Sequence, residues 1–132
     1  MSLELLDKLK KVQQRLLKDA QDLVIKQNDL KGEVAFYYPD FSRVDSFNMH
    51  EFSSDLGSFD DPGKTTTLVV DLQGVGSISF QGFEFLLLLQ TSFKRRRGEI
   101  VLMDVEDDVK ANLEKSGLGG SFRQIDSKKV NA

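Results

Sequence analysis

The first part of the chain carries apolar residues at helical spacing. Between Ser2 and Leu23 they recur every three or four positions, and lysine and glutamine fill much of the opposite side. This pattern predicts an amphipathic helix with one apolar stripe, which we assign to residues 1–22. The stripe consists of Leu5, Leu9, Val12, Leu16 and Leu23, with Leu6, Leu17 and Val24 one step round the helix.

Three kinds of surface would cover this stripe. In the first case the stripe packs on its own domain. In the second it pairs with another chain to give a homodimer through the N-terminal helix, and in the third it lies on a membrane surface. Three turns of heptad spacing are too few to establish a coiled coil. Tryptophan is absent and the polar side carries Asp and Gln beside its lysines, which disfavours the membrane. Packing on the domain and pairing with another chain both stay open.

The hydrophobic pattern shortens after the predicted helix. Residues 23–27 and 33–38 have the character of strands, and the turn-forming residues between them predict a hairpin. Residues 48–56 return to helical spacing. Residues 57–64 contain Asp-Asp-Pro-Gly, which is typical of an exposed loop.

The second half of the chain alternates strands and helices. Residues 65–72 are β-branched and nearly continuous in apolar character, which indicates a central strand covered on both faces. A largely buried helix is predicted over 81–94, a second buried strand over 99–104, a helix over 107–116 that stops at glycine, and a last strand over 121–125.

This order predicts an α/β fold. Strands separated by helices and short loops imply right-handed crossovers, so we expect a mixed, mainly parallel sheet of four to five strands with packed helices. The domain is assigned to residues 23–126. The polar residues 127–132 are expected to form a frayed tail.

Composition narrows the chemistry. The chain has 132 residues, 39% hydrophobic and 30% charged, which fits one globular domain, and its net charge of −3 gives no general attraction to nucleic acid. It has no cysteine and one histidine, His50, so thiolate metal sites, a cysteine nucleophile and paired imidazoles are excluded. The longest apolar run, Phe85 to Leu89, is far below the roughly 20 residues of a membrane span. We expect a cytoplasmic protein that is not an enzyme, with no metal, cofactor or nucleic-acid partner.

One central segment resembles a known family. Leu68 to Phe83 reads Leu-Val-Val-Asp-Leu-Gln-Gly-Val-Gly-Ser-Ile-Ser-Phe-Gln-Gly-Phe and aligns without a gap to the central segment of STAS domains. In that family a strand ending Asp-Leu-x-x-Val leads into Ile-Asp-Ser-x-Gly-Leu and a helix. Further similar stretches are Val44–Leu56, Arg97–Leu102 and Val109–Leu118, and the resemblance covers roughly Leu23 to Ile125.

The resemblance implies a regulatory protein. STAS domains include anti-sigma factor antagonists and the cytoplasmic domains of sulfate permeases. In the antagonists, a kinase phosphorylates the serine at the start of the helix, and the added charge of about −2 breaks the complex with the anti-sigma factor. Carried over to this chain, the Asp position is Ser79 and the phosphoacceptor position is Phe80. No phosphoacceptor is therefore expected. Ser79 is a weak candidate, with helix capping the stronger interpretation.

The resemblance also implies where a partner binds. The expected contact residues surround the start of the helix: Ser77, Ser79, Phe80, Gln81 and Phe83. Phe80 has two interpretations, a core aromatic or an exposed anchor for a protein partner. The nearest functional model is a bacterial signalling domain that resembles an anti-sigma factor antagonist, binds an anti-sigma factor or kinase-like protein, and is not switched at the usual serine. The alternative is a STAS subunit of a membrane transport system, of the sulfate permease or lipid ABC-transporter type, which binds a transporter component.

Two other features carry weaker signals. The basic run Lys94 to Arg97 falls in the last turn of a predicted helix, where the helix dipole favours cations without any ligand. An acidic partner, an anionic headgroup or a nucleotide phosphate is the functional alternative. No Lys-Ser/Thr of a phosphate loop follows the glycines Gly74, Gly76, Gly82, Gly117, Gly119 and Gly120, and His50 has no partner of catalytic spacing.

Overall fold

A computed structural model describes residues 2–61 and 64–127. The chain divides into two compact units, Met1–Leu30 and Lys31–Ala132. Among the described residues, no helix is both long enough and apolar enough to cross a membrane.

The first unit is one long helix, α1 (Leu3–Gln27). Ser2 caps its start, because the serine hydroxyl accepts a hydrogen bond from the Leu5 N–H at 3.1 Å. Asn28 closes its end. Both the backbone N–H and the side-chain amide of Asn28 donate to the Val24 carbonyl, and Asp29 then adopts a positive φ of 54°.

The predicted hairpin is wrong. Residues 23–27 continue the helix, and residues 34–37 form a strand that pairs with a distant part of the chain instead of a neighbour. The physical reason is that the apolar positions Leu23 and Val24 fit the helical stripe as well as they fit a strand. Lys26 and Gln27 are also good helix formers, so local preference continues the helix up to Asn28.

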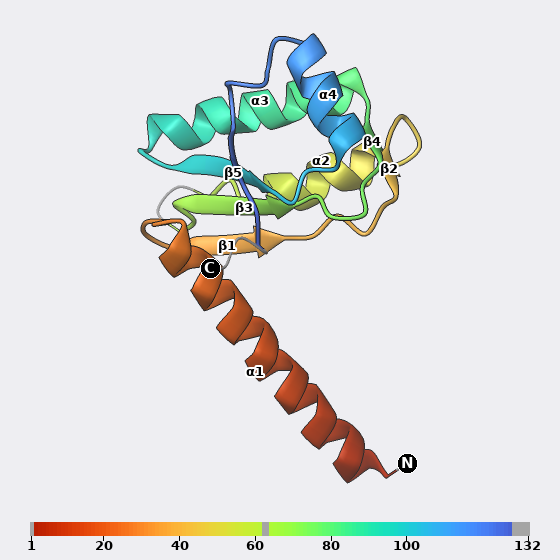
Figure 1. Cartoon of the computed structure of the whole chain (residues 1–132), viewed down its shortest axis with the longest axis vertical. Coiled ribbons are helices and arrows are strands. Elements are labelled where there is room, and N and C mark those ends of the chain that lie inside the picture. The colour runs from red at the N-terminus through yellow and green to blue at the C-terminus, as the bar shows by residue number, and fades with distance from the viewer. Residues whose placement is uncertain (1, 62–63, 128–132) are drawn as a thin grey trace. The chain divides into compact units, whose positions relative to one another are not determined.

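The second unit is a parallel sheet with helices against it (Figure 1). Four strands lie in the order β1 (Val34–Tyr37), β3 (Thr67–Asp71), β5 (Glu99–Met103) and β6 (Arg123–Ile125), and all their pairings are parallel. The short strands β2 (Arg43–Val44) and β4 (Ser77–Ile78) form a separate parallel pair. This arrangement confirms the predicted α/β class and mainly parallel sheet.

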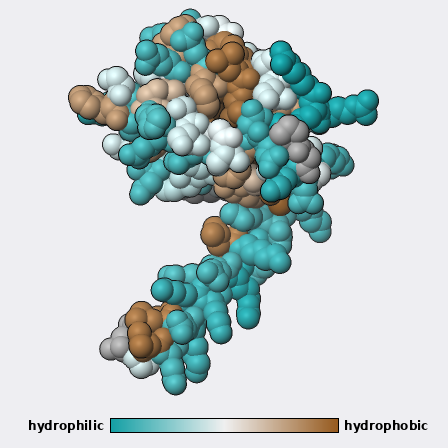
Figure 2. All heavy atoms as spheres, turned by 180° about the vertical axis from the view of Figure 1, so that it is seen from behind, coloured by the Kyte–Doolittle hydropathy of each residue, from teal (hydrophilic) through white to brown (hydrophobic). Residues whose placement is uncertain are grey.

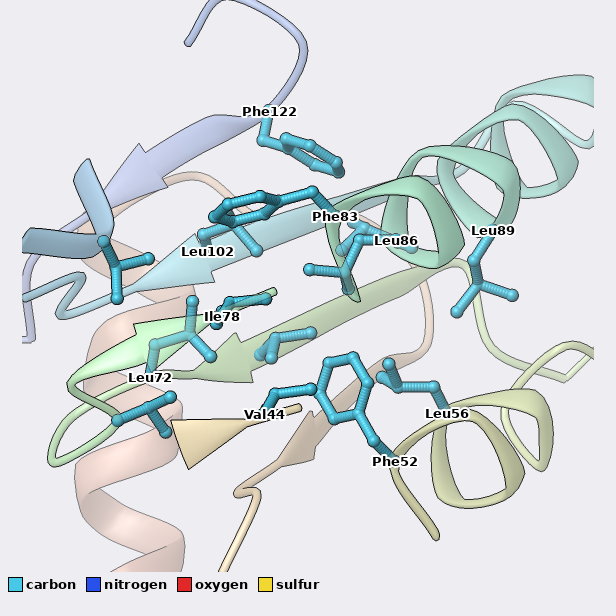
Figure 3. Packing of buried hydrophobic residues seen from close by; sticks show 14 of the residues in the cluster. Val44, Phe52, Leu56, Leu72, Ile78, Phe83, Leu86, Leu89, Leu102 and Phe122 are labelled. Atoms are coloured by element: carbon cyan, nitrogen blue, oxygen red, sulfur yellow. The ribbon is translucent and has the colours of Figure 1, made fainter. Parts of the chain in front are cut away.

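Three helices complete the second unit: α2 (Met49–Gly57), α3 (Phe80–Arg95) and α4 (Asp107–Lys115). Their bounds agree with the sequence predictions to within one residue. Alternate side chains of β3 and β5 join side chains from the helices in one hydrophobic core, so α2, α3 and α4 cover the same face of the sheet. Phe52, Leu56, Phe83 and Leu86 point from α2 and α3 into this core (Figure 3).

The strand β3 is central in the sheet, as predicted. Its residues Leu68 and Val70 belong to the core under the helices, while Val69 between them points to the opposite face and is also fully buried. Burial on both faces explains why the strand has no polar alternation.

The start of the predicted tail is anchored. The backbone N–H and the hydroxyl of Ser127 donate to the Asp104 carboxylate at 2.9 and 2.6 Å, so the expectation of fraying is wrong for this residue. The rest of the predicted tail, 128–132, lies outside the described residues.

Candidate functional site

The start of α3 is built on the β2–β4 pair. Backbone hydrogen bonds of 2.8 Å join Gly76 N–H to the Ser42 carbonyl and Ser79 N–H to the Val44 carbonyl, on either side of the paired residues. Val44 and Ile78 are buried beneath. The segment that carries the family resemblance is therefore held in place by the short strand that precedes α2.

Gly82 lets the helix approach this pair closely. A Cβ at this position would lie 2.6 Å from a methyl of Ile78 and 3.2 Å from a methyl of Val44. Any side chain would push the first turn of α3 away from the two strands. The glycine therefore sets where the exposed residues of that turn stand.

Ser79 caps α3. It has an extended backbone, with φ −67° and ψ 162°, and its hydroxyl accepts a hydrogen bond from the Gly82 N–H at 3.3 Å. This geometry confirms the capping role expected for Ser79. The side chain is partly buried.

The other predicted contact residues divide between surface and core. Ser77 and Gln81 are exposed. Phe80 occupies the first position of α3 and has 63% of its surface accessible. Phe83 is only 2% exposed and belongs to the hydrophobic core. The surface at the start of α3 thus presents Phe80 but not Phe83.

Two further apolar side chains are exposed near this segment, and the sequence analysis did not single them out. Phe47 is 89% exposed and follows β2, the partner of β4, while Leu88 is 70% exposed and lies two turns along α3 from Phe80. The space-filling view shows hydrophobic groups at the surface of this unit among hydrophilic ones (Figure 2). We call Phe47, Phe80 and Leu88 together the exposed apolar residues.

The turn that carries Phe47 is tightly held. Asn48 accepts from the Asp45 N–H at 2.9 Å and donates from its side-chain amide to the Arg43 carbonyl at 2.7 Å. The Asp45 carboxylate accepts from the Phe47 N–H at 3.0 Å. Because these hydrogen bonds fix the backbone on both sides of Phe47, the exposed ring stands on an ordered turn.

Two titratable groups of this unit have altered pKa values. Burial raises the pKa of the Tyr37 phenol far above its ordinary value, and the hydrogen bond that it donates to Asp55 at 2.9 Å raises it further. Burial also raises the pKa of the Asp71 carboxyl, the Gln73 N–H opposes this by donating to it, and the nearby Asp104 carboxylate adds to the rise. The Tyr37 hydrogen bond links β1 to α2.

The basic run at the end of α3 has two parts with different roles. Lys94, Arg95 and Arg97 are exposed. Lys94 and Arg97 border a cavity of about 330 Å³, together with Lys31, Thr66, Thr67, Gly98 and Glu99. The C-terminal carbonyls of α3 and the Glu99 carboxylate reduce the positive potential there. We therefore assign this cavity no ligand.

Arg96 is a structural residue. Its side chain is 17% exposed, pairs with the Asp60 carboxylate at 2.6 Å, and donates to the carbonyls of Phe59 and Thr65. The guanidinium also lies 4.0 Å from the centroid of the Phe93 ring. Arg96 thus ties the segment before β3 to the end of α3, a role that the uniform basic run in the sequence does not reveal.

We expect Arg96→Ala to lower the free energy of unfolding by about 1–2 kcal/mol, because the hydrogen bonds to Phe59, Asp60 and Thr65 are lost at a partly buried site. Arg95→Ala, next to it and exposed, is the matched control and should change stability by less than about 0.5 kcal/mol. Urea unfolding measures both. Equal effects of the two substitutions would contradict the assigned role of Arg96.

The chain belongs to the STAS domain family, whose model matches residues 31–132. Among solved structures, the anti-sigma factor antagonist SpoIIAA in its unphosphorylated form is similar with a TM-score of 0.62 and 16% identity, over 75% of this chain and 84% of that one. The Bacillus SpoIIAA in its phosphorylated form gives 0.58 and 15%, over 75% and 86%. These likenesses show the fold.

A transporter protein is similarly close. A sulfate transporter family protein from Wolinella succinogenes has a TM-score of 0.59 and 18% identity, over 73% of this chain and 79% of that one. The comparison with curated proteins gives no match. The STAS fold of this chain therefore resembles both anti-sigma factor antagonists and the sulfate transporter family.

Proposed function

We propose that this chain is a non-enzymatic regulatory domain that binds a protein partner through the start of α3, with Phe80 as the central contact. The observation that carries the proposal is the 63% exposure of a phenylalanine at the first position of a capped helix. Phe80 belongs neither to the hydrophobic core nor to the partly buried residues packed against it. Exposed aromatic anchors on rigid elements are typical of the residues that dominate protein interfaces.

The neighbouring side chains support this surface. Phe47 stands on a turn fixed by three hydrogen bonds, and that turn follows the strand to which the segment before Phe80 is bonded. Leu88 is a further exposed apolar residue two turns along α3, and the exposed Ser77 and Gln81 supply polar groups next to Phe80 in the sequence. Preordered contact residues reduce the entropy lost on binding.

The proposed contact is constitutive. The phenyl ring of Phe80 accepts no phosphate, and the nearest hydroxyl, that of Ser79, is engaged as the helix cap. The model for this function is the anti-sigma factor antagonist, with the phosphorylation switch at the usual serine missing. A partner of the anti-sigma factor or kinase-like class is expected in the cytoplasm.

The alternative is a role as the STAS subunit of a membrane transport system. The TM-score of 0.59 with the sulfate transporter family protein supports this transport role. The TM-score of 0.62 with SpoIIAA, which supports the antagonist role, is of similar size. The same exposed apolar residues would then contact a transporter component. Identification of the bound partner separates the two functions.

The test is affinity capture from an extract of the source cell with the full chain, identification of the partner by mass spectrometry, and a binding isotherm with the purified partner. We expect Phe80→Ala to weaken binding by about 1–3 kcal/mol without loss of thermal stability, because the ring contributes contact area and no core packing. Lys64→Ala is the matched control. Lys64 is exposed and precedes β3, whereas α3 begins beyond the opposite end of that strand.

Two results would contradict the proposal. Unchanged affinity of the Phe80→Ala variant would remove the start of α3 from the interface. Stoichiometric phosphorylation of Ser79 by a captured kinase, with loss of binding, would show that the domain is switched after all.

A further inference from the structure

The helix α1 exposes its apolar stripe along most of its length. Every side chain from Ser2 to Ala20 is exposed. The stripe residues Leu5, Leu9, Val12, Leu16 and Leu23 keep between 44% and 63% of their surface accessible. In Figure 2, α1 is seen from a side where hydrophilic groups predominate, with hydrophobic groups gathered near its N-terminal end. Because helices in proteins gain most of their stability by packing an apolar face, this stripe needs a second surface.

The spacing of the stripe fits another helix. Leu5, Leu9, Val12 and Leu16 alternate in steps of four and three residues, which places Leu9, Leu16 and Leu23 at heptad position a and Leu5 and Val12 at position d. The polar side carries charges of both signs, among them Asp7, Lys11, Lys18 and Asp22, so it lacks the uniformly basic character of a helix that lies on an anionic membrane.

The two flanks of the stripe differ in character. Position g carries the charged residues Lys8, Arg15 and Asp22, while position e carries Leu6, Gln13 and Ala20. In a parallel pair of helices position g of one helix meets position e of the other. In an antiparallel pair position g meets position g of the other helix, and position e meets position e.

The flank residues favour an antiparallel pair of two copies. Such a pair places Leu6 beside Ala20 of the second copy and Lys8 beside Asp22 of the second copy. Apolar flanks then meet, and two contacts between opposite charges form against a single like-charge contact, that between the two Arg15 side chains at the symmetry axis. The antiparallel pair sets Asp19, at position d, opposite Leu9 of the second copy. A parallel pair would instead set Asp19 against its own copy, and Lys26 likewise, because both residues occupy position d. Like charges held together in an interface are unfavourable.

We propose that α1 pairs with α1 of a second copy of this chain as an antiparallel coiled coil, making the protein a homodimer. The interface consists of the apolar stripe, with Lys8 and Asp22 forming two symmetric ion pairs at its edges. The residues involved all belong to α1, and none of them is among the residues proposed to bind the partner. Dimerisation and partner binding can therefore fail independently.

The first test is the mass of the full chain in solution by sedimentation equilibrium. We expect twice the chain mass of 14.9 kDa. Leu9→Asp should raise the dimer dissociation constant at least tenfold by placing a carboxylate in the stripe, and Gln14→Asp, which adds the same group on the outer side, should leave it within about twofold. Circular dichroism confirms that each variant retains its strands. A wild-type chain that stays monomeric throughout the micromolar range would overturn the proposal, whether or not it binds anionic vesicles.

The second test fixes the orientation of the helices. The chain contains no cysteine, so single cysteines can be introduced and joined by a short bis-maleimide. We expect Gln13→Cys to crosslink to its copy, because residue 13 lies near the symmetry axis of the antiparallel pair, and Lys26→Cys not to crosslink. The reverse result would indicate a parallel dimer and overturn the proposed orientation. Lys8→Asp should weaken the dimer, and adding Asp22→Lys should restore it.

Discussion

Phe83→Ala is expected to lower the free energy of unfolding by about 3–5 kcal/mol, the largest effect of any substitution considered for this domain. Phe83 is 2% exposed and points from the first turns of α3 into the core near Phe122 and Leu102 (Figure 3). Its removal leaves a cavity that the parallel sheet and the helix cannot close. Urea denaturation followed by circular dichroism measures the loss.

Phe80→Ala is the matched control for that substitution. The same side chain is deleted on the same helix three residues earlier, but the Phe80 ring is 63% exposed. Its stability cost should stay below about 1 kcal/mol, because little buried area is lost. Comparable destabilisation by both variants would show that Phe80 packs inward, and would exclude it as the partner contact.

Gln90→Leu is expected to cost about 2–4 kcal/mol, although it replaces a polar side chain in the core with an apolar one of similar size. Gln90 is 4% exposed. Its side-chain oxygen accepts from the Ile100 N–H at 2.7 Å, and its amide donates to the Ser121 carbonyl at 2.9 Å. The substitution leaves the buried Ile100 N–H and the partly buried Ser121 carbonyl without these partners.

The control for Gln90→Leu is Thr91→Leu. Thr91 is the next residue of α3 and is exposed, so this substitution adds the same side chain without touching the link between α3, β5 and the Ser121 segment. Thermal unfolding should show a large decrease for the first variant and little change for the second. Unchanged or higher stability of Gln90→Leu would mean that the freed backbone groups find other partners.

Most of the fold of the second unit was predictable from local sequence. The β-branched run before Asp71, the apolar helix that follows Ser79 and the stop at Gly117 each carry a signal that one short segment contains by itself. Short connections between such elements allow few arrangements other than a parallel sheet with right-handed crossovers. The family resemblance adds the position of the site, since it aligns the start of α3 residue by residue.

The wrong prediction came from a segment whose pattern fits two structures. Leu23-Val24-Ile25 suits a strand or the last turns of a helix, and no residue before Asn28 interrupts the helix. The strand β1 then pairs with β3, more than thirty residues away, because a parallel neighbour must be reached through a crossover. Pairing over that separation leaves no signal in a short window of sequence.

The sequence by itself determined the class of fold, the family and the absence of a hydroxyl at the position of the family's phosphoacceptor, because each of these depends on residue identity and spacing. Only the tertiary structure decided which aromatic side chain faces solvent. Phe80 and Phe83 are chemically identical and three residues apart, and the β2–β4 pair with Gly82 against it sets the rotation of α3 that buries one and exposes the other. The contacts of Arg96 are likewise tertiary, since they join it to residues more than thirty positions earlier in the chain.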